Sequence, residues 1–84
     1  MTDDTRRQYQ TVKCINPAWL NRQIGMRLLR LRKTRGLTQA QVGIALRVTR
    51  AAVANWELGN QNFVVTTLYD LARFYRVPVK RLLP

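Results

Sequence analysis

Residues 36–59 read GLTQAQVGIALRVTRAAVANWELG, and this stretch predicts two short helices joined by a tight turn. Thr38 is a favoured N-cap residue for the first helix, and Thr49 is a favoured N-cap residue for the second. The second helix begins at Arg50 and ends at Gly59, because glycine adopts the left-handed conformation that ends helices at little cost. The helical period then predicts which apolar side chains face the core. They are Val42, Leu46, Val48, Val53 and Trp56.

The flanking segments also predict helices. Asn16 is a good N-cap and Pro17 a good first helical residue, and the helix that follows ends at Gly36. Its apolar stripe consists of Leu20, Ile24, Leu28 and Leu31. A fourth helix is predicted from Val65 or Thr66 to Tyr75, with Leu68, Leu71, Ala72 and Tyr75 inward, and a last short helix from Pro78 to Leu83.

Five helices with short connections predict a compact all-α domain over residues 17–84. At 84 residues the chain is expected to contain one domain at most. Residues 1–16 are polar and without helical period, so we expect a flexible N-terminal arm. Within this arm Tyr9 to Ile15 has some β-forming character, and a short strand is the alternative.

The chain is strongly basic. It contains 15 lysines and arginines against 4 acidic residues, for a formal net charge of +11. Such a chain repels itself when compact, so we expect an anionic partner: nucleic acid, an anionic membrane surface or an acidic protein.

Cys14 is the only cysteine, which excludes an intrachain disulfide and favours a reducing cytoplasm. The first ten residues have acids first and no apolar core region, so we expect no signal peptide, and no apolar run approaches the length of a membrane span.

Two short helices joined by a tight turn are a helix-turn-helix candidate, with Gly43 where the helices would cross closely. The surrounding sequence resembles the lambda-repressor-like DNA-binding domain of phage repressors and Cro proteins. The matching segments are IGMRLLRLRKTRGLTQAQVGIAL, VTRAAVANWELG, LYDLARFYRV and PVKRLL, within about residues 20 to 83. The resemblance implies a second motif helix that lies in the major groove of double-stranded DNA.

Two positions depart from the family pattern. Arg47 stands where the turn usually has glycine, so we expect it to adopt a left-handed conformation at a cost of about 1 kcal/mol. We expect it to be tolerated there because it also reaches a phosphate. Phe63 stands in the loop before the fourth helix, where the family often has proline.

The second motif helix carries the candidates for base reading. Val53 and Trp56 point inward, and alanines on the outward face let a helix about 10 Å across enter a groove about 12 Å wide. Arg50 suits guanine, Asn55 suits adenine, and the methyl group of Ala51 suits thymine. The resemblance matches these three residues to base-reading positions. Helix propensity alone is the alternative explanation for the alanines, but it leaves an outward Asn55 unexplained.

Other residues are candidates for contacts with the DNA backbone. Gln39 begins the first motif helix, where its amide and nearby N–H groups can hold a phosphate; a solvated first-turn side chain is the alternative. Thr49 matches a position close to the backbone or the first base. The remaining phosphate candidates are Arg35, Arg47, Asn60 and Asn62. The resemblance also pairs Glu57 with Arg32 in a structural ion pair that holds the first helix against the recognition helix.

These features predict a sequence-specific transcriptional regulator, most simply a repressor that binds a palindromic operator as a homodimer. The expected dimer surface is the last helix, Val77 to Leu83, or the arm; its apolar candidates are Val79, Leu82 and Leu83. The alternative is an antitoxin that binds both a toxin and its own operator.

Other classes of function fit less well. The chain has no histidine and no nucleophile–base pair, phosphate loop or metal-ligand cluster, so we expect no enzyme, cofactor or metal site. RNA binding lacks an aromatic stacking platform. A membrane-surface helix would need the apolar stripe that the core uses.

Overall fold

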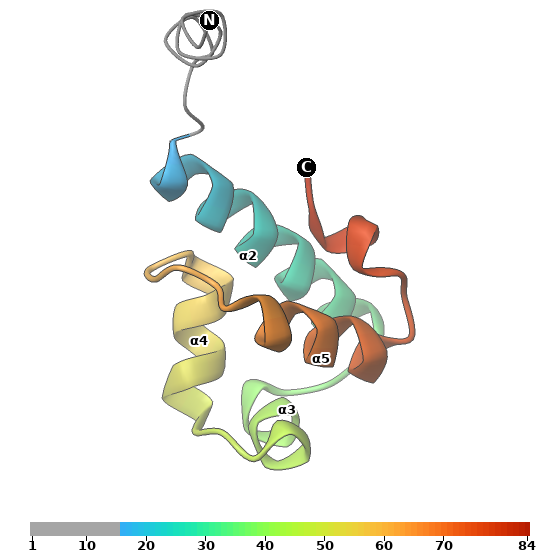
Figure 1. Ribbon diagram of the computed structural model, residues 1–84. Coiled ribbons are helices and arrows are strands. Elements are labelled where there is room, and N and C mark those ends of the chain that lie inside the picture. The colour runs from blue at the N-terminus through green and yellow to red at the C-terminus, as the bar shows by residue number, and fades with distance from the viewer. Residues whose placement is uncertain (1–15) are drawn as a thin grey trace, which may run out of the picture.

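The computed structural model describes residues 16–84, and this part of the chain folds into four α-helices and one 3-10 helix (Figure 1). The helices are α2 (Pro17–Thr34), α3 (Gln39–Leu46), α4 (Arg50–Leu58), α5 (Val65–Tyr75) and η1 (Val79–Leu82). The predicted all-α class is therefore confirmed. The predicted arm lies outside the described residues apart from Asn16, and so does the segment from Tyr9 to Ile15.

Three of the helices have the side-chain N-caps that the sequence predicts. The Asn16 side chain accepts hydrogen bonds from the backbone N–H groups of Ala18 and Trp19 at the start of α2. Thr38 and Gln41 form a reciprocal capping box at the start of α3. Thr49 caps α4 by accepting a hydrogen bond from the backbone N–H of Ala52. Each such cap stabilises its helix by about 1 kcal/mol.

The predicted last short helix is present, but it is not α-helical, because residues Val79–Leu82 form a 3-10 helix. The backbone N–H of Arg81 donates to the carbonyl of Pro78 at 2.9 Å, and that of Leu83 donates to Lys80 at 3.2 Å. These i→i+3 bonds make a tighter turn, which suits short segments. Leu82 is 0% exposed and fixes this turn against the core. It is therefore not available as an exposed dimer contact, and Leu83 is the exposed apolar residue here.

The core lies between α2, the α3–α4 pair, and α5 with η1. Its buried members are Ile24, Leu28, Val42, Val53, Trp56, Leu71, Ala72, Tyr75 and Leu82. The side chains of Leu46 and Val48 are partly buried and pack against this cluster. The helical period therefore identified the inward face of each motif helix correctly.

Glycines allow α4 to lie close to its neighbours. A Cβ atom on Gly25 would lie 2.5 Å from the carbonyl oxygens of Trp56 and Glu57, so α2 and α4 touch backbone to backbone there. A Cβ atom on Gly43 would lie 2.8 Å from the carbonyl oxygen of Val48. The close approach predicted at Gly43 is confirmed, whereas the role of Gly25 was not predicted.

Candidate nucleic-acid interface

The exposed face of α4 carries the three residues that the sequence predicts to read bases. Val53 and Trp56 are 2% and 9% exposed and point into the core. Arg50, Ala51 and Asn55 are exposed on the same helix. Because Ala51 is small, the backbone of α4 is accessible between two longer polar side chains. The outward orientation is therefore present, and base reading stays a prediction.

The turn between α3 and α4 is closed by a left-handed residue. Arg47 has φ 60° and ψ 42°, the conformation expected from its place in the motif. The next residue, Val48, donates its backbone N–H to the carbonyl of Gly43 at 2.9 Å. The Arg47 side chain is exposed and lies two residues before the N-cap of α4. It is thus positioned beside the start of the candidate recognition helix.

The starts of α3 and α4 both present unbonded backbone donors. In α3 the capping box uses the N–H groups of Thr38 and Gln41, and those of Gln39 and Ala40 are among the first four, which have no intrahelical acceptor. In α4 the Thr49 cap leaves the N–H groups of Arg50 and Ala51 in the same position. Such N–H pairs at the positive end of a helix favour an anion.

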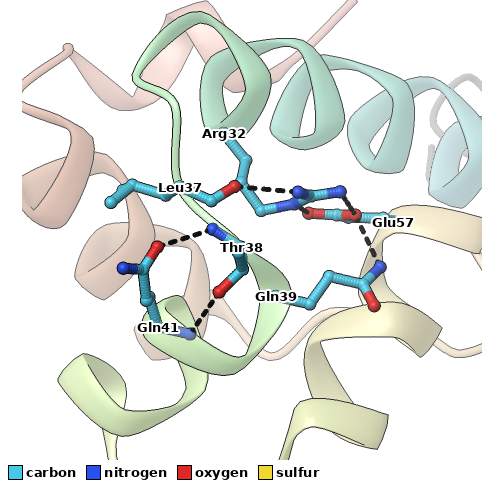
Figure 2. A network of polar contacts seen from close by, with 6 residues as sticks. All are labelled: Arg32, Leu37, Thr38, Gln39, Gln41 and Glu57. Atoms are coloured by element: carbon cyan, nitrogen blue, oxygen red, sulfur yellow. Dashed lines mark hydrogen bonds and ion pairs between the residues drawn. The ribbon is translucent and has the colours of Figure 1, made fainter.

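A buried ion pair fixes α4 against α2 and α3 (Figure 2). Arg32 Nε donates to Glu57 Oε2 at 2.7 Å, and Arg32 Nη2 donates to Glu57 Oε1 at 3.0 Å. The side chains of Arg32 and Glu57 are only 11% and 3% exposed. Arg32 also donates to the carbonyl of Leu37 at 2.9 Å, and Gln39 Nε2 donates to Glu57 Oε1 at 3.0 Å. The two residues that the resemblance pairs therefore lie together, with Gln39 as a third partner.

The ion pair shifts the pKa of Arg32, and the pKa of the neighbouring Tyr75 is shifted as well. The hydrogen bonds that Arg32 donates to Glu57 raise the pKa of Arg32 above its ordinary value, against a smaller opposing effect of burial. Nearby, burial raises the pKa of Tyr75 to about 12, and the negative charge of Glu57 adds to this shift. Arg32 therefore stays protonated and Tyr75 stays neutral well above neutral pH.

Gln39 has a structural contact that the sequence does not predict. One N–H of its Nε2 is donated to Glu57 Oε1 at 3.0 Å, and the second N–H of the same amide remains available as a donor. A phosphate contact by the Gln39 amide, together with the backbone N–H groups of Gln39 and Ala40, therefore stays a prediction. Sequence reasoning missed the bond to Glu57 because the two residues lie 18 positions apart.

The remaining phosphate candidates lie in different places. Asn60 donates from Nδ2 to Asn55 Oδ1 at 3.4 Å, next to the exposed face of α4 that carries the candidate base-reading residues. Asn62 accepts a 2.7 Å hydrogen bond from the buried Asn21, which ties the loop after α4 to α2. Both candidates therefore lie on the loop that follows α4.

Arg35 is the C-cap residue of α2, and its side chain reaches the C-terminal end of α5. It donates to the carbonyl of Tyr75 at 2.6 Å, and its guanidinium lies 5.7 Å from the centre of the Tyr75 ring. The structure does not bring Arg35 to α4. Its bond satisfies a carbonyl that the end of α5 leaves without a helical partner.

Residues 16–84 contain no group of three or more metal-ligating side chains suited to hold an ion. None of the helices in this range is both long and apolar enough to cross a bilayer.

Comparisons with known proteins give a consistent result. A family model described as a helix-turn-helix domain matches residues 23–83. The DNA-binding domain of BldD is 33% identical, with a TM-score of 0.73 over 80% of this chain and 97% of that one. The same domain from S. venezulae is 34% identical, with a TM-score of 0.71 over 77% of this chain and 97% of that one.

A third solved structure is more distant. The restriction-modification controller protein C.AhdI from Aeromonas hydrophila is 26% identical, with a TM-score of 0.69 over 74% of this chain and 94% of that one. No curated protein matches the chain significantly.

Proposed function

The chain belongs to the helix-turn-helix domain family, and we propose that it is a sequence-specific regulator of transcription that binds double-stranded DNA, most simply a repressor. The solved structures that resemble it support this proposal, since they include the DNA-binding domain of BldD and a restriction-modification controller protein. The single observation that carries it is the exposed face of α4, with Arg50, Ala51 and Asn55 outward while Val53 and Trp56 hold the helix in the core.

Base specificity comes from two side chains in this proposal. Arg50 donates two hydrogen bonds to guanine O6 and N7, and Asn55 pairs with adenine N6 and N7. Each bidentate pair discriminates against a wrong base by about 1–3 kcal/mol. The hydrogen bond from Asn60 to Asn55 Oδ1 is compatible with this assignment, because Asn55 Nδ2 stays free to donate to N7 and the second lone pair of Oδ1 can accept from N6.

Phosphate contacts supply the affinity and the register. The free N–H pairs at the starts of α3 and α4 and the guanidinium of Arg47 are the donors for this role. Thr49 supports the same contact through its cap, which holds the first turn of α4 in place. The contacts neutralise DNA charge and release counterions, so binding must weaken steeply with salt.

We further propose that the protein acts as a homodimer on a palindromic operator. Because Leu82 is buried and Val79 packs against the core, the last turn offers only Leu83 to a partner, and a larger exposed apolar surface lies at the start of α5. Val64, Val65 and Tyr69 are 63%, 64% and 55% exposed, and Val65 and Tyr69 lie four residues apart on one helix face. Burying these side chains against a second copy gives the apolar centre that a stable interface needs.

Selection of bound duplexes from a random pool tests this function. We expect an enriched palindrome whose half-sites lie one helical turn apart, about 34 Å. With three to five phosphate contacts per subunit, log affinity should fall against log salt with a slope of about −5 to −9. A slope near zero, or a pool without enrichment, would contradict the proposal. If this chain is instead a monomer that co-purifies with another small protein, the antitoxin function would be favoured.

A further inference from the structure

An arginine-lined cleft lies on the side of α2 away from the candidate recognition helix. Its volume is about 340 Å³, and it is lined by Arg27, Arg30, Leu31, Thr34, Arg35 and Arg81. The first four recur along α2 with the i, i+3, i+4, i+7 spacing of a single helix face, and Arg81 comes from η1. We call this feature the arginine cleft. Its volume lies within the range of about 300–1,000 Å³ that small-molecule sites occupy.

The arginine cleft is separate from the proposed DNA interface. Gly25 and Arg32 mark the face of α2 that contacts α4. At about 100° per residue, positions 27, 30, 31 and 34 are centred roughly half a turn around the helix from Gly25. In Figure 1, η1 and α4 lie on different sides of α2. A duplex held by α4 therefore does not occupy the arginine cleft.

No carboxylate lines the cleft. Residues 16–84 contain two acidic side chains, Glu57 and Asp70. Glu57 is buried in its pair with Arg32, and Asp70 lines a different hollow with Arg47 and Arg73. The guanidiniums of the arginine cleft consequently repel one another without a counter-charge from the described part of the chain.

Two of the four arginines are already oriented by the protein. Arg27 Nη1 donates to the backbone carbonyl and side-chain oxygen of Gln23 at 3.2 and 3.3 Å. Arg35 Nη2 donates to the carbonyl of Tyr75 at 2.6 Å. Each guanidinium has five N–H donors, so both keep donors for a ligand. Arg30 and Arg81 make no ion pair with any residue in 16–84 and are free to close on a ligand from the two sides.

We propose that the arginine cleft binds a compact polyanion that carries two or more phosphate groups, either an inorganic polyphosphate or a nucleoside polyphosphate. Guanidinium groups match phosphate oxygens in a bidentate manner, and several arginines in one hollow satisfy several phosphates at once. Thr34 adds a hydroxyl donor. Leu31 adds an apolar wall against which a nucleoside can pack.

The test is equilibrium dialysis of the full chain, free of DNA, with inorganic triphosphate or ATP at about 0.15 M salt, where long-range charge effects are screened. We expect a saturable site. The double variant Arg30→Gln/Arg81→Gln should bind at least about ten-fold more weakly, because two charge-assisted contacts are lost. The control Arg73→Gln/Arg76→Gln removes the same charge from the last turn and C-cap of α5 and should bind within about two-fold of the wild type. Thermal melting checks that each variant is folded.

Comparing ATP with triphosphate, and the two double variants with each other, distinguishes the possible ligands and tests the proposal. Tighter binding of ATP than of triphosphate supports a nucleoside ligand, and equal binding supports an inorganic one. Equal losses in the two double variants, or no saturable binding by the wild type, would overturn the proposal. So would a loss of DNA affinity in Arg30→Gln/Arg81→Gln with unchanged triphosphate binding, since the cleft would then be a DNA contact. Failure of operator selection would leave the triphosphate result unaffected.

Discussion

Replacing Glu57 with glutamine should destabilise the domain strongly. The carboxylate accepts from Arg32 Nε at 2.7 Å, from Arg32 Nη2 at 3.0 Å and from Gln39 Nε2 at 3.0 Å. Glutamine turns one of these oxygens into a donor that faces another donor, and it leaves the Arg32 side chain, 11% exposed, without its counter-charge. Breaking a buried ion pair on one side costs about 3–5 kcal/mol. The whole stability of a small domain is about 5–15 kcal/mol.

Chemical denaturation measures this loss in the free energy of unfolding. The melting temperature should also fall by at least about 12 °C, since 1 kcal/mol corresponds to about 4–8 °C in a domain of this size. Asp70→Asn is the matched control, because it removes the same charge from an exposed position and should change stability by less than about 0.5 kcal/mol. Arg32→Met/Glu57→Met should cost less than the sum of its single changes. A Glu57→Gln protein as stable as Asp70→Asn would refute the proposed importance of the pair.

Three further changes test the core. Trp56→Ala should lower the free energy of unfolding by about 3–5 kcal/mol; an unchanged melting temperature with weaker DNA binding would mean that the indole faces DNA. Gly25→Ala puts a methyl group 2.5 Å from two carbonyl oxygens of α4 and should cost about 1–3 kcal/mol in chemical denaturation; a neutral result would contradict the backbone contact. Tyr75 keeps its proton to a pKa of about 12 when folded, against the ordinary 10.0, so stability should fall with rising pH between these values. The stability of Tyr75→Phe should fall less over that range. A pH profile of stability identical to that of the wild type would contradict the raised pKa of Tyr75.

Local features of the fold follow from the sequence. The caps at Asn16, Thr38 and Thr49 involve residues two or three positions apart, so the sequence alone identifies them. The inward faces of the helices follow from the 3.6-residue period. The left-handed Arg47 was expected because the resemblance marks its place in the turn.

The long-range contacts could not be predicted in this way. Arg35 contacts Tyr75 and Asn21 contacts Asn62 across about 40 residues, and neither pair has a local signal. The Arg32–Glu57 pair was expected from the resemblance alone, since no spacing rule joins residues on different helices. The 3-10 geometry of η1 depends on where Leu82 meets the core, which the helical period does not specify.

The central claim, that α4 reads bases through its exposed face, is tested most directly by one comparison. The affinities of the wild type and of Asn55→Ala are measured on the selected operator and on a random duplex at the same salt concentration. We expect Asn55→Ala to lose about 1–3 kcal/mol on the operator and much less on the random duplex, because a base contact carries specificity whereas phosphate contacts do not. Equal losses on both duplexes would contradict the claim.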